Sequence, residues 1–141
     1  MPSSVVIADK DGGILTELRG GRGDLPVYLA ASGDGRNYWT EKIDITATGD
    51  NTIHTPATGK RFYVTNLTFS TGVSGEVLFK SGTTDISGPM NLAAYGGISV
   101  AVTNPTDPPL LQGSAINNAF VLMVRNAATM DVGGFCSGYD E

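Results

Sequence analysis

The stretch that decides the fold lies in the middle of the chain, where residues 61–69 read RFYVTNLTF and residues 75–81 read GEVLFKS. β-Branched and aromatic residues in such runs favour the pleated, half-buried surface of a strand. The flanking residues 46–60 and 82–102 continue the pattern, because short apolar runs alternate there with Gly, Asp, Asn and Pro. No segment of the stretch has the apolar period of a helix, so it predicts antiparallel strands.

The same pattern extends over the rest of the chain from Tyr38 onward and predicts eight strands. We expect them within residues 43–47, 52–55, 62–69, 76–81, 86–92, 98–102, 115–125 and 131–136. Residues 103–109 contain three prolines and are expected to be irregular. Eight antiparallel strands in two sheets predict an all-β fold, a jelly-roll-like β-sandwich over residues 37–141. Another sandwich or a barrel would fit the same strands.

Residues 1–36 differ from this pattern and are interpreted as an extended N-terminal arm. Residues 4–8 and 14–18 flank a Gly-rich turn and predict a hairpin. Pro26 cannot donate to a β-ladder, so residues 25–29 are expected to form an edge strand or an extended segment. Gly, Ser and Asp dominate residues 31–37, which favours a linker before the sandwich.

Composition narrows the classes of function. Charged residues make up 16% of the chain, well below the roughly 25% of an average soluble domain, which favours a surface covered by a partner. The net charge is −5 and the basic residues are scattered, so nucleic-acid binding is not expected. The chain starts without a signal-peptide pattern, and no apolar run approaches the ~20 residues of a membrane span. We therefore expect no membrane partner and synthesis in the cytosol.

Candidate catalytic and metal-binding residues are few and do not form a pattern. His54 is the single histidine and has no Cys or second His at metal-ligand spacing, so we interpret it as structural or exposed. Cys136, the single cysteine, cannot form an internal disulfide and is expected in a buried strand. Residues 9–13 begin like a calcium loop but lack its later acidic ligands. We predict a protein that is not an enzyme and holds no cofactor or metal.

Three acidic residues and two aromatic residues were considered for carbohydrate chemistry. Glu41, Asp44 and Glu76 are of the type that hydrolyses glycosides, but solvated strand faces also explain them. Tyr38 and Trp39, with Lys60-Arg61, could line a sugar-binding face, although such aromatics are more often core or interface anchors. The tripeptide Arg22-Gly23-Asp24 is too short to support a role in adhesion.

A series of loop motifs resembles small virion proteins of tailed phages. In order along the chain the motifs are Gly49-Asp50-Asn51-Thr52-Ile53, Gly59-Lys60-Arg61, Lys80-Ser81-Gly82-Thr83-Thr84 and Gly88-Pro89-Met90-Asn91-Leu92-Ala93-Ala94-Tyr95-Gly96-Gly97. The resemblance covers roughly residues 42–134, and residues 1–36 lie outside it. Proteins of this kind include head decoration (cement) proteins and short fibre or spike components, and are typically trimeric jelly rolls.

The resemblance implies a homotrimeric cement protein on the capsid surface of a virion, with the major capsid protein as its partner. We expect the N-terminal arm to make much of the capsid contact, because an added strand gains main-chain hydrogen bonds from a partner's sheet edge. The candidate contact residues are Val5, Val6, Ile7, Leu25, Val27 and Leu29. The alternative is a glycan- or receptor-binding fibre module, which requires Trp39 and Tyr95 to face solvent.

Overall fold

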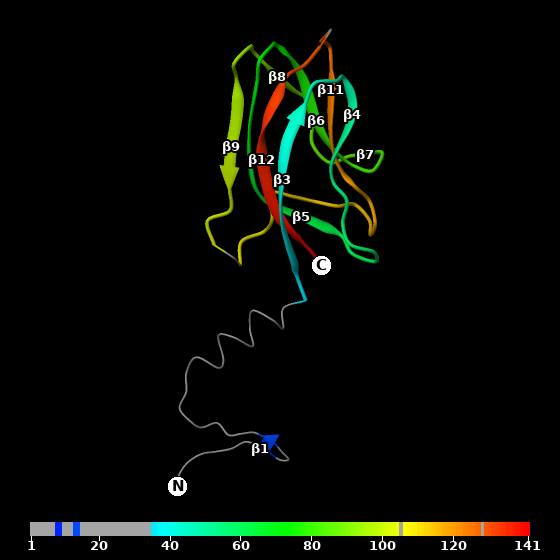
Figure 1. Cartoon of the computed structure of the whole chain (residues 1–141), viewed down its shortest axis with the longest axis vertical. Helices are drawn as coiled ribbons and strands as arrows, with labels where there is room; N and C mark the ends of the chain where they lie inside the picture. The colour runs from blue at the N-terminus through cyan, green and yellow to red at the C-terminus, as the bar shows by residue number, and fades with distance from the viewer. Residues whose placement is uncertain (1–7, 10–12, 15–34, 105, 128) are drawn as a thin grey trace. The chain divides into compact units, whose positions relative to one another are not determined.

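The computed structural model of the chain describes residues 8–9, 13–14, 35–104, 106–127 and 129–141 (Figure 1). The chain divides into two compact units, residues 1–35 and residues 36–141. In the first unit, β1 (Ala8–Asp9) pairs antiparallel with β2 (Gly13–Ile14), as expected for the centre of the predicted hairpin. The predicted strand at residues 25–29 and most of the predicted linker lie outside the described residues.

The second unit is built from strands, and its described residues contain no helix. These strands are β3 (Asn37–Ile45), β4 (Gly49–His54), β5 (Phe62–Thr71), β6 (Gly75–Ser81), β7 (Thr84–Asp85), β8 (Met90–Leu92), β9 (Gly97–Ala101), β10 (Leu111–Gln112), β11 (Phe120–Arg125) and β12 (Val132–Asp140). Within the described part of the chain, no helix could span a membrane.

The strands form two antiparallel sheets that pack against each other (Figure 1). The first sheet has the order β10-β5-β12-β3, with β9 also paired to β5, and the second has the order β4-β11-β6-β7, with β8 also paired to β6. The principal strands therefore run β3-β12-β5-β9 and β4-β11-β6-β8. The last strand, β12, pairs with β3, the first strand of the sandwich, and the connections between the principal strands cross between the sheets except the one from β6 to β8. This is the strand order of a jelly roll, which confirms the predicted fold class.

The core lies between the sheets because alternate residues of each long strand are apolar. On β5 the buried positions include Phe62, Val64, Leu67 and Phe69, while the other residues from Tyr63 to Thr68 are only partly buried. The ring of Phe120 on β11 lies 5.1 Å from that of Phe62, so the two sheets interdigitate at this point. The buried cluster comprises Ile43, Ile45, Phe62, Val64, Leu67, Phe69, Val77, Phe79, Phe120, Leu122, Val124, Met130, Val132 and Cys136.

Several strands differ from the predicted ones. The strand predicted at residues 86–92 is reduced to β8, and β3 begins at Asn37, before the predicted start at residue 43. The two-residue strands β7 and β10 were not expected, and they extend the sheet edges beside β6 and β5. Residues 115–119 were predicted as strand, but the strand β11 begins at Phe120. Asn117 has a φ of 64° and accepts a hydrogen bond from the N–H of Gly59, so this segment turns instead of extending the ladder. Strand is absent from the described residues between Thr103 and Pro109, as expected.

Candidate functional site

The outward surface of the first sheet carries few charged side chains, and we call it the open face. Its side chains alternate with core residues along β3, β5, β9 and β12. They are Tyr38, Thr40, Lys42, Asp44, Tyr63, Thr65, Thr68, Ser70, Ser99, Phe135, Ser137 and Tyr139. Among these described side chains only Lys42 and Asp44 are charged, and they pair with each other at 2.9 Å. The Arg36 guanidinium also reaches this face, above the Tyr139 ring, and pairs with Glu141 at 3.3 Å. The open face therefore offers a partner hydroxyl groups and aromatic rings with little net charge.

Aromatic side chains gather on the open face near the C-terminal end of β12. The ring of Tyr139 stacks on Tyr63 at 5.0 Å and lies 5.9 Å from Tyr38, which is 66% exposed. The guanidinium of Arg36 lies 4.2 Å above the Tyr139 ring in a cation–π contact. Burial raises the pKa of Tyr139, and the neighbouring Arg36 charge opposes this rise. Further along β12, Phe135 is 46% exposed.

The outward surface of the second sheet has a different character because ion pairs span its strands. Nζ of Lys80 on β6 lies 2.8 Å from Oδ2 of Asp50 on β4. Nε of Arg125 on β11 lies 2.7 Å from Oε1 of Glu76 on β6. These four charged side chains pair with one another within the sheet. The open face therefore has fewer charged residues than the outward surface of the second sheet. Depletion of charged residues is typical of the core of a protein interface.

A buried polar cluster joins the two sheets at one corner of the sandwich. Oδ1 of Asp140 accepts a hydrogen bond from Nε1 of Trp39 and lies 2.9 Å from Nε2 of His54. Nδ1 of His54 lies 3.2 Å from Oε2 of Glu41, and the indole of Trp39 stacks on the imidazole at 4.1 Å. Oδ2 of Asp140 accepts a further hydrogen bond from the N–H of Ala57. The cluster ties β3, β4 and β12 together.

This geometry makes His54 structural, which was one of its two expected roles. Both ring nitrogens face carboxylates, so neither is available to activate a nucleophile. The sequence contained no signal for the cluster, because Trp39 and Asp140 are 101 positions apart. Within the described residues, no group of three or more His, Cys, Asp and Glu side chains is placed to hold a metal ion.

Cys136 lies in β12 and is fully buried, as predicted. Burial raises the pKa of its thiol to about 12, and the nearby negative charge of Glu41 adds to this effect. A thiol in such surroundings stays protonated near neutral pH, which removes the thiolate that a nucleophile requires.

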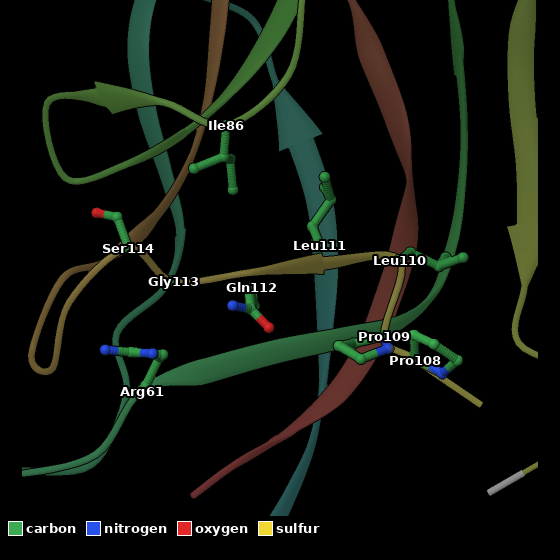
Figure 2. Close-up of a pocket in the computed structure, with 9 residues that line it drawn as sticks. All are labelled: Arg61, Ile86, Pro108, Pro109, Leu110, Leu111, Gln112, Gly113 and Ser114. Carbon is green, nitrogen blue, oxygen red and sulfur yellow. The ribbon is translucent and has the colours of Figure 1, made fainter. Parts of the chain in front are cut away.

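A groove opens beside β10 at the start of β5 (Figure 2). Its volume is about 470 Å³, and Figure 2 shows Arg61 and Ser114 at one end and Pro108 and Pro109 at the other. Nε of Arg61 is buried and has no hydrogen-bond partner within the described structure. In the sequence, Arg61 belongs to the Gly59-Lys60-Arg61 motif and is a candidate for a sugar-binding face. The groove was not predicted because β10 was not recognised, although the proline segment beside it was expected to be irregular.

No protein-family model, curated protein or solved structure matches this chain.

Of the residues singled out in the sequence, Trp39, Glu41 and His54 meet in the buried cluster, but the three acids have separate partners. Asp44 pairs with Lys42, Glu76 with Arg125, and Glu41 with His54, so the three acids are separately engaged. The six candidate contact residues of the arm lie outside the described residues.

The two aromatics required by the glycan-binding alternative are also far apart. Tyr95 is 87% exposed, as that alternative needs. Trp39 is partly buried against His54, and it pairs with Gly138 at one end of β12. The N–H of Tyr95 bonds to Thr71, which pairs with Val132 at the other end of β12. Trp39 and Tyr95 therefore do not form one platform.

Proposed function

We propose that this chain is a structural protein of a bacteriophage virion, a capsid decoration protein that binds the assembled head and stabilises it without catalysis. The observation that carries the proposal is the open face. It is extended and poor in charge, and its exposed aromatic side chains, Tyr38 and Phe135, are of the type enriched in the cores of protein interfaces. Such a surface suits contact with a second protein, which we take to be the major capsid protein.

The positions of the phage-like motifs support the same proposal. The Gly49–Ile53 motif lies on β4, an edge strand of the second sheet, and the Lys80–Thr84 motif forms the connection between β6 and β7. The bond between Lys80 and Asp50 links these two motifs across β11. These two motifs thus lie in the second sheet, whereas the Gly59-Lys60-Arg61 motif precedes β5 and the last motif runs from β8 to the start of β9.

Stabilisation of the shell would follow from mass action. A protein that binds the assembled head and not its free subunits lowers the free energy of the assembled state by RT ln(1 + [L]/Kd) for each site. We further propose that the protein acts as a homotrimer, with the N-terminal arm reaching the capsid. This assigns it to the capsid surface of the virion after synthesis in the host cytoplasm.

The test compares binding of the purified protein to undecorated heads by co-sedimentation, with its oligomeric state measured by analytical ultracentrifugation. The wild-type protein should sediment as a trimer and saturate heads at a fixed ratio set by the capsid lattice. Phe135→Lys places a charge at the centre of the open face and should weaken binding by about tenfold or more, since an unpaired charge is costly to bury.

The matched control is Thr52→Lys, which adds the same charge at an exposed position on the other sheet. It should leave head binding unchanged. A protein that stays monomeric and ignores heads would contradict the proposal. So would equal binding by the two lysine variants, because the open face would then not be the contact surface.

A further inference from the structure

The Arg61 side chain is a cation without an internal partner. Its backbone is held firmly, because the N–H and carbonyl of Arg61 exchange two hydrogen bonds of 3.0 Å with Glu141. No hydrogen bond or ion pair joins the Arg61 guanidinium to another described residue, and its Nε is also shielded from solvent. Buried donors in folded proteins are nearly always paired, so an unpaired guanidinium nitrogen points to an acceptor that is bound from outside.

The groove beside Arg61 has the shape and chemistry to hold that acceptor. Its wall is apolar at Pro108, Pro109 and Leu111, and it becomes polar toward Arg61 (Figure 2). The stem of Arg61 is confined, since a Cβ at Gly113 would lie 3.0 Å from Cγ of Arg61. The amide of Gln112 also lines the groove and makes no side-chain hydrogen bond with a described residue. One end therefore offers unpaired donors, and the other offers apolar surface.

We propose that this groove is a binding site for an organic carboxylate that is joined to a compact apolar body. The carboxylate would sit on the Arg61 guanidinium, whose planar fork matches two carboxylate oxygens, and the apolar body would lie against Pro108 and Pro109. The Gln112 amide donates to the second oxygen or to a polar group beside it. Nε of Arg61 is shielded from solvent, so its contact with the ligand would require a rotation of the side chain, and adjustments of this kind are common on binding.

Charge complementarity sets the ligand class. The chain carries a net charge of −5, and several of its other cations are already paired, as Lys42, Lys80 and Arg125 show. A neutral ligand would leave the guanidinium without an acceptor of opposite charge. The site goes beyond the proposed head binding and does not depend on it, because the groove is a separate feature from the open face.

The experiment is an NMR titration of the full-length, ¹⁵N-labelled protein at neutral pH. The probe is N-acetylleucine, which joins a carboxylate to a branched apolar side chain, and the matched probe is the neutral N-acetylleucinamide. N-acetylleucine should cause saturable shifts of the Arg61 Nε–H signal and of the Gly113 and Ser114 amides. The amide probe should bind at least about tenfold more weakly, because it lacks the charge-assisted hydrogen bonds.

Arg61→Gln should lower the affinity for N-acetylleucine by about tenfold or more. Lys60→Gln removes the same charge one position away and should leave the affinity unchanged. If Arg61→Gln does not fold, Arg61→Lys keeps the charge but lacks the planar fork, and it should also bind more weakly. The proposal is overturned if N-acetylleucine causes no saturable shift, if the two probes bind equally, or if the Arg61 variants bind as tightly as the wild type.

Discussion

Asp140 shows how much a single residue can contribute to this sandwich. Its two carboxylate oxygens serve Trp39, His54 and the N–H of Ala57, which come from three different segments. Asp140→Ala would remove the acceptor from these buried and part-buried groups. Since an unsatisfied buried donor costs roughly 1–3 kcal/mol, we expect a loss of about 2 kcal/mol or more in the free energy of unfolding, measured with urea.

Asp44→Ala is the control for this prediction, because it removes the same group from an exposed position on β3. Exposed ion pairs contribute little, so its free energy of unfolding should stay within about 1 kcal/mol of the wild type. Equal losses in the two variants would contradict a stabilising role for the cluster around Asp140.

The raised pKa of the Cys136 thiol predicts that the free energy of unfolding decreases at alkaline pH. Burial raises the pKa of its thiol from an ordinary value of 9.0 to about 12 in the folded protein. Between these values the thiol ionises in the unfolded chain but not in the folded one. The folded state therefore loses stability as the pH rises from about 9 to about 12, and keeps its full stability below this window.

Replacing the thiol isolates this effect from the other groups that titrate in the same range, such as Tyr139. The free energy of unfolding of Cys136→Ala should be lower at pH 8, because a buried side chain has been shortened. It should then fall less steeply than that of the wild type between pH 9 and pH 11. The free energies of unfolding are measured by chemical denaturation at each pH. If they fall with pH at the same rate in the two proteins, Cys136 does not contribute to the loss of stability at alkaline pH.

At the scale of elements, β12 is the strand on which the first sheet depends. It lies between β3 and β5 and pairs with both along its whole length. This close packing requires glycine at Gly134 and at Gly138. A Cβ at Gly138 would lie 1.9 Å from the carbonyl oxygen of Tyr63, and a Cβ at Gly134 would lie 2.0 Å from the carbonyl oxygen of Thr68 and 2.6 Å from Cα of Phe69. A side chain at either position could be accommodated only by a shift of the backbone.

We therefore expect Gly134→Ala to destabilise the protein by about 2 kcal/mol or more, since overpacking against backbone forces the strands apart. Gly133→Ala is the matched control, as nothing lies within 4 Å of a Cβ at that neighbouring position. It should change the free energy of unfolding by less than about 0.5 kcal/mol. Urea denaturation of both variants measures the difference, and similar midpoints would contradict the inferred crowding.

At the scale of the whole molecule, residues 36–141 form a complete unit. The buried core runs from Ile43 to Cys136, and the unit begins with Arg36, whose Nε lies 3.3 Å from Oε1 of Glu141. We expect a fragment of residues 36–141 to fold alone, with a single cooperative urea transition close to that of the full chain. The near-ultraviolet circular dichroism of Trp39 and the tyrosines reports its tertiary packing.

A fragment that lacks this signal, or that unfolds at a much lower urea concentration, would show that residues 1–35 belong to the folded core. If the fragment folds as expected, it also distinguishes the contribution of the open face to head binding from that of the arm. Head binding by the fragment would then depend on the open face alone, and loss of binding would assign the capsid contact to the arm.

Much of the fold could be predicted because strand signals are local. The alternation of apolar and polar residues along β3 shows which of its faces is buried, whatever its neighbours are. The short strands β7 and β10 could not be found in this way. A strand of two residues is too short to show an apolar period. These two strands form because β6 and β5 supply partners for their backbone groups.

The sequence by itself determined the all-β class, the principal strands, the irregular proline segment and the burial of Cys136. Only the tertiary structure decided which strands are neighbours, and this choice created the open face, the cluster around Asp140 and the groove at Arg61. Strand order depends on contacts between residues far apart in the chain, such as His54 and Asp140, which are separated by 86 positions. Local periodicity carries no information about such pairs, so sites assembled across strands appear only when the sheets have formed.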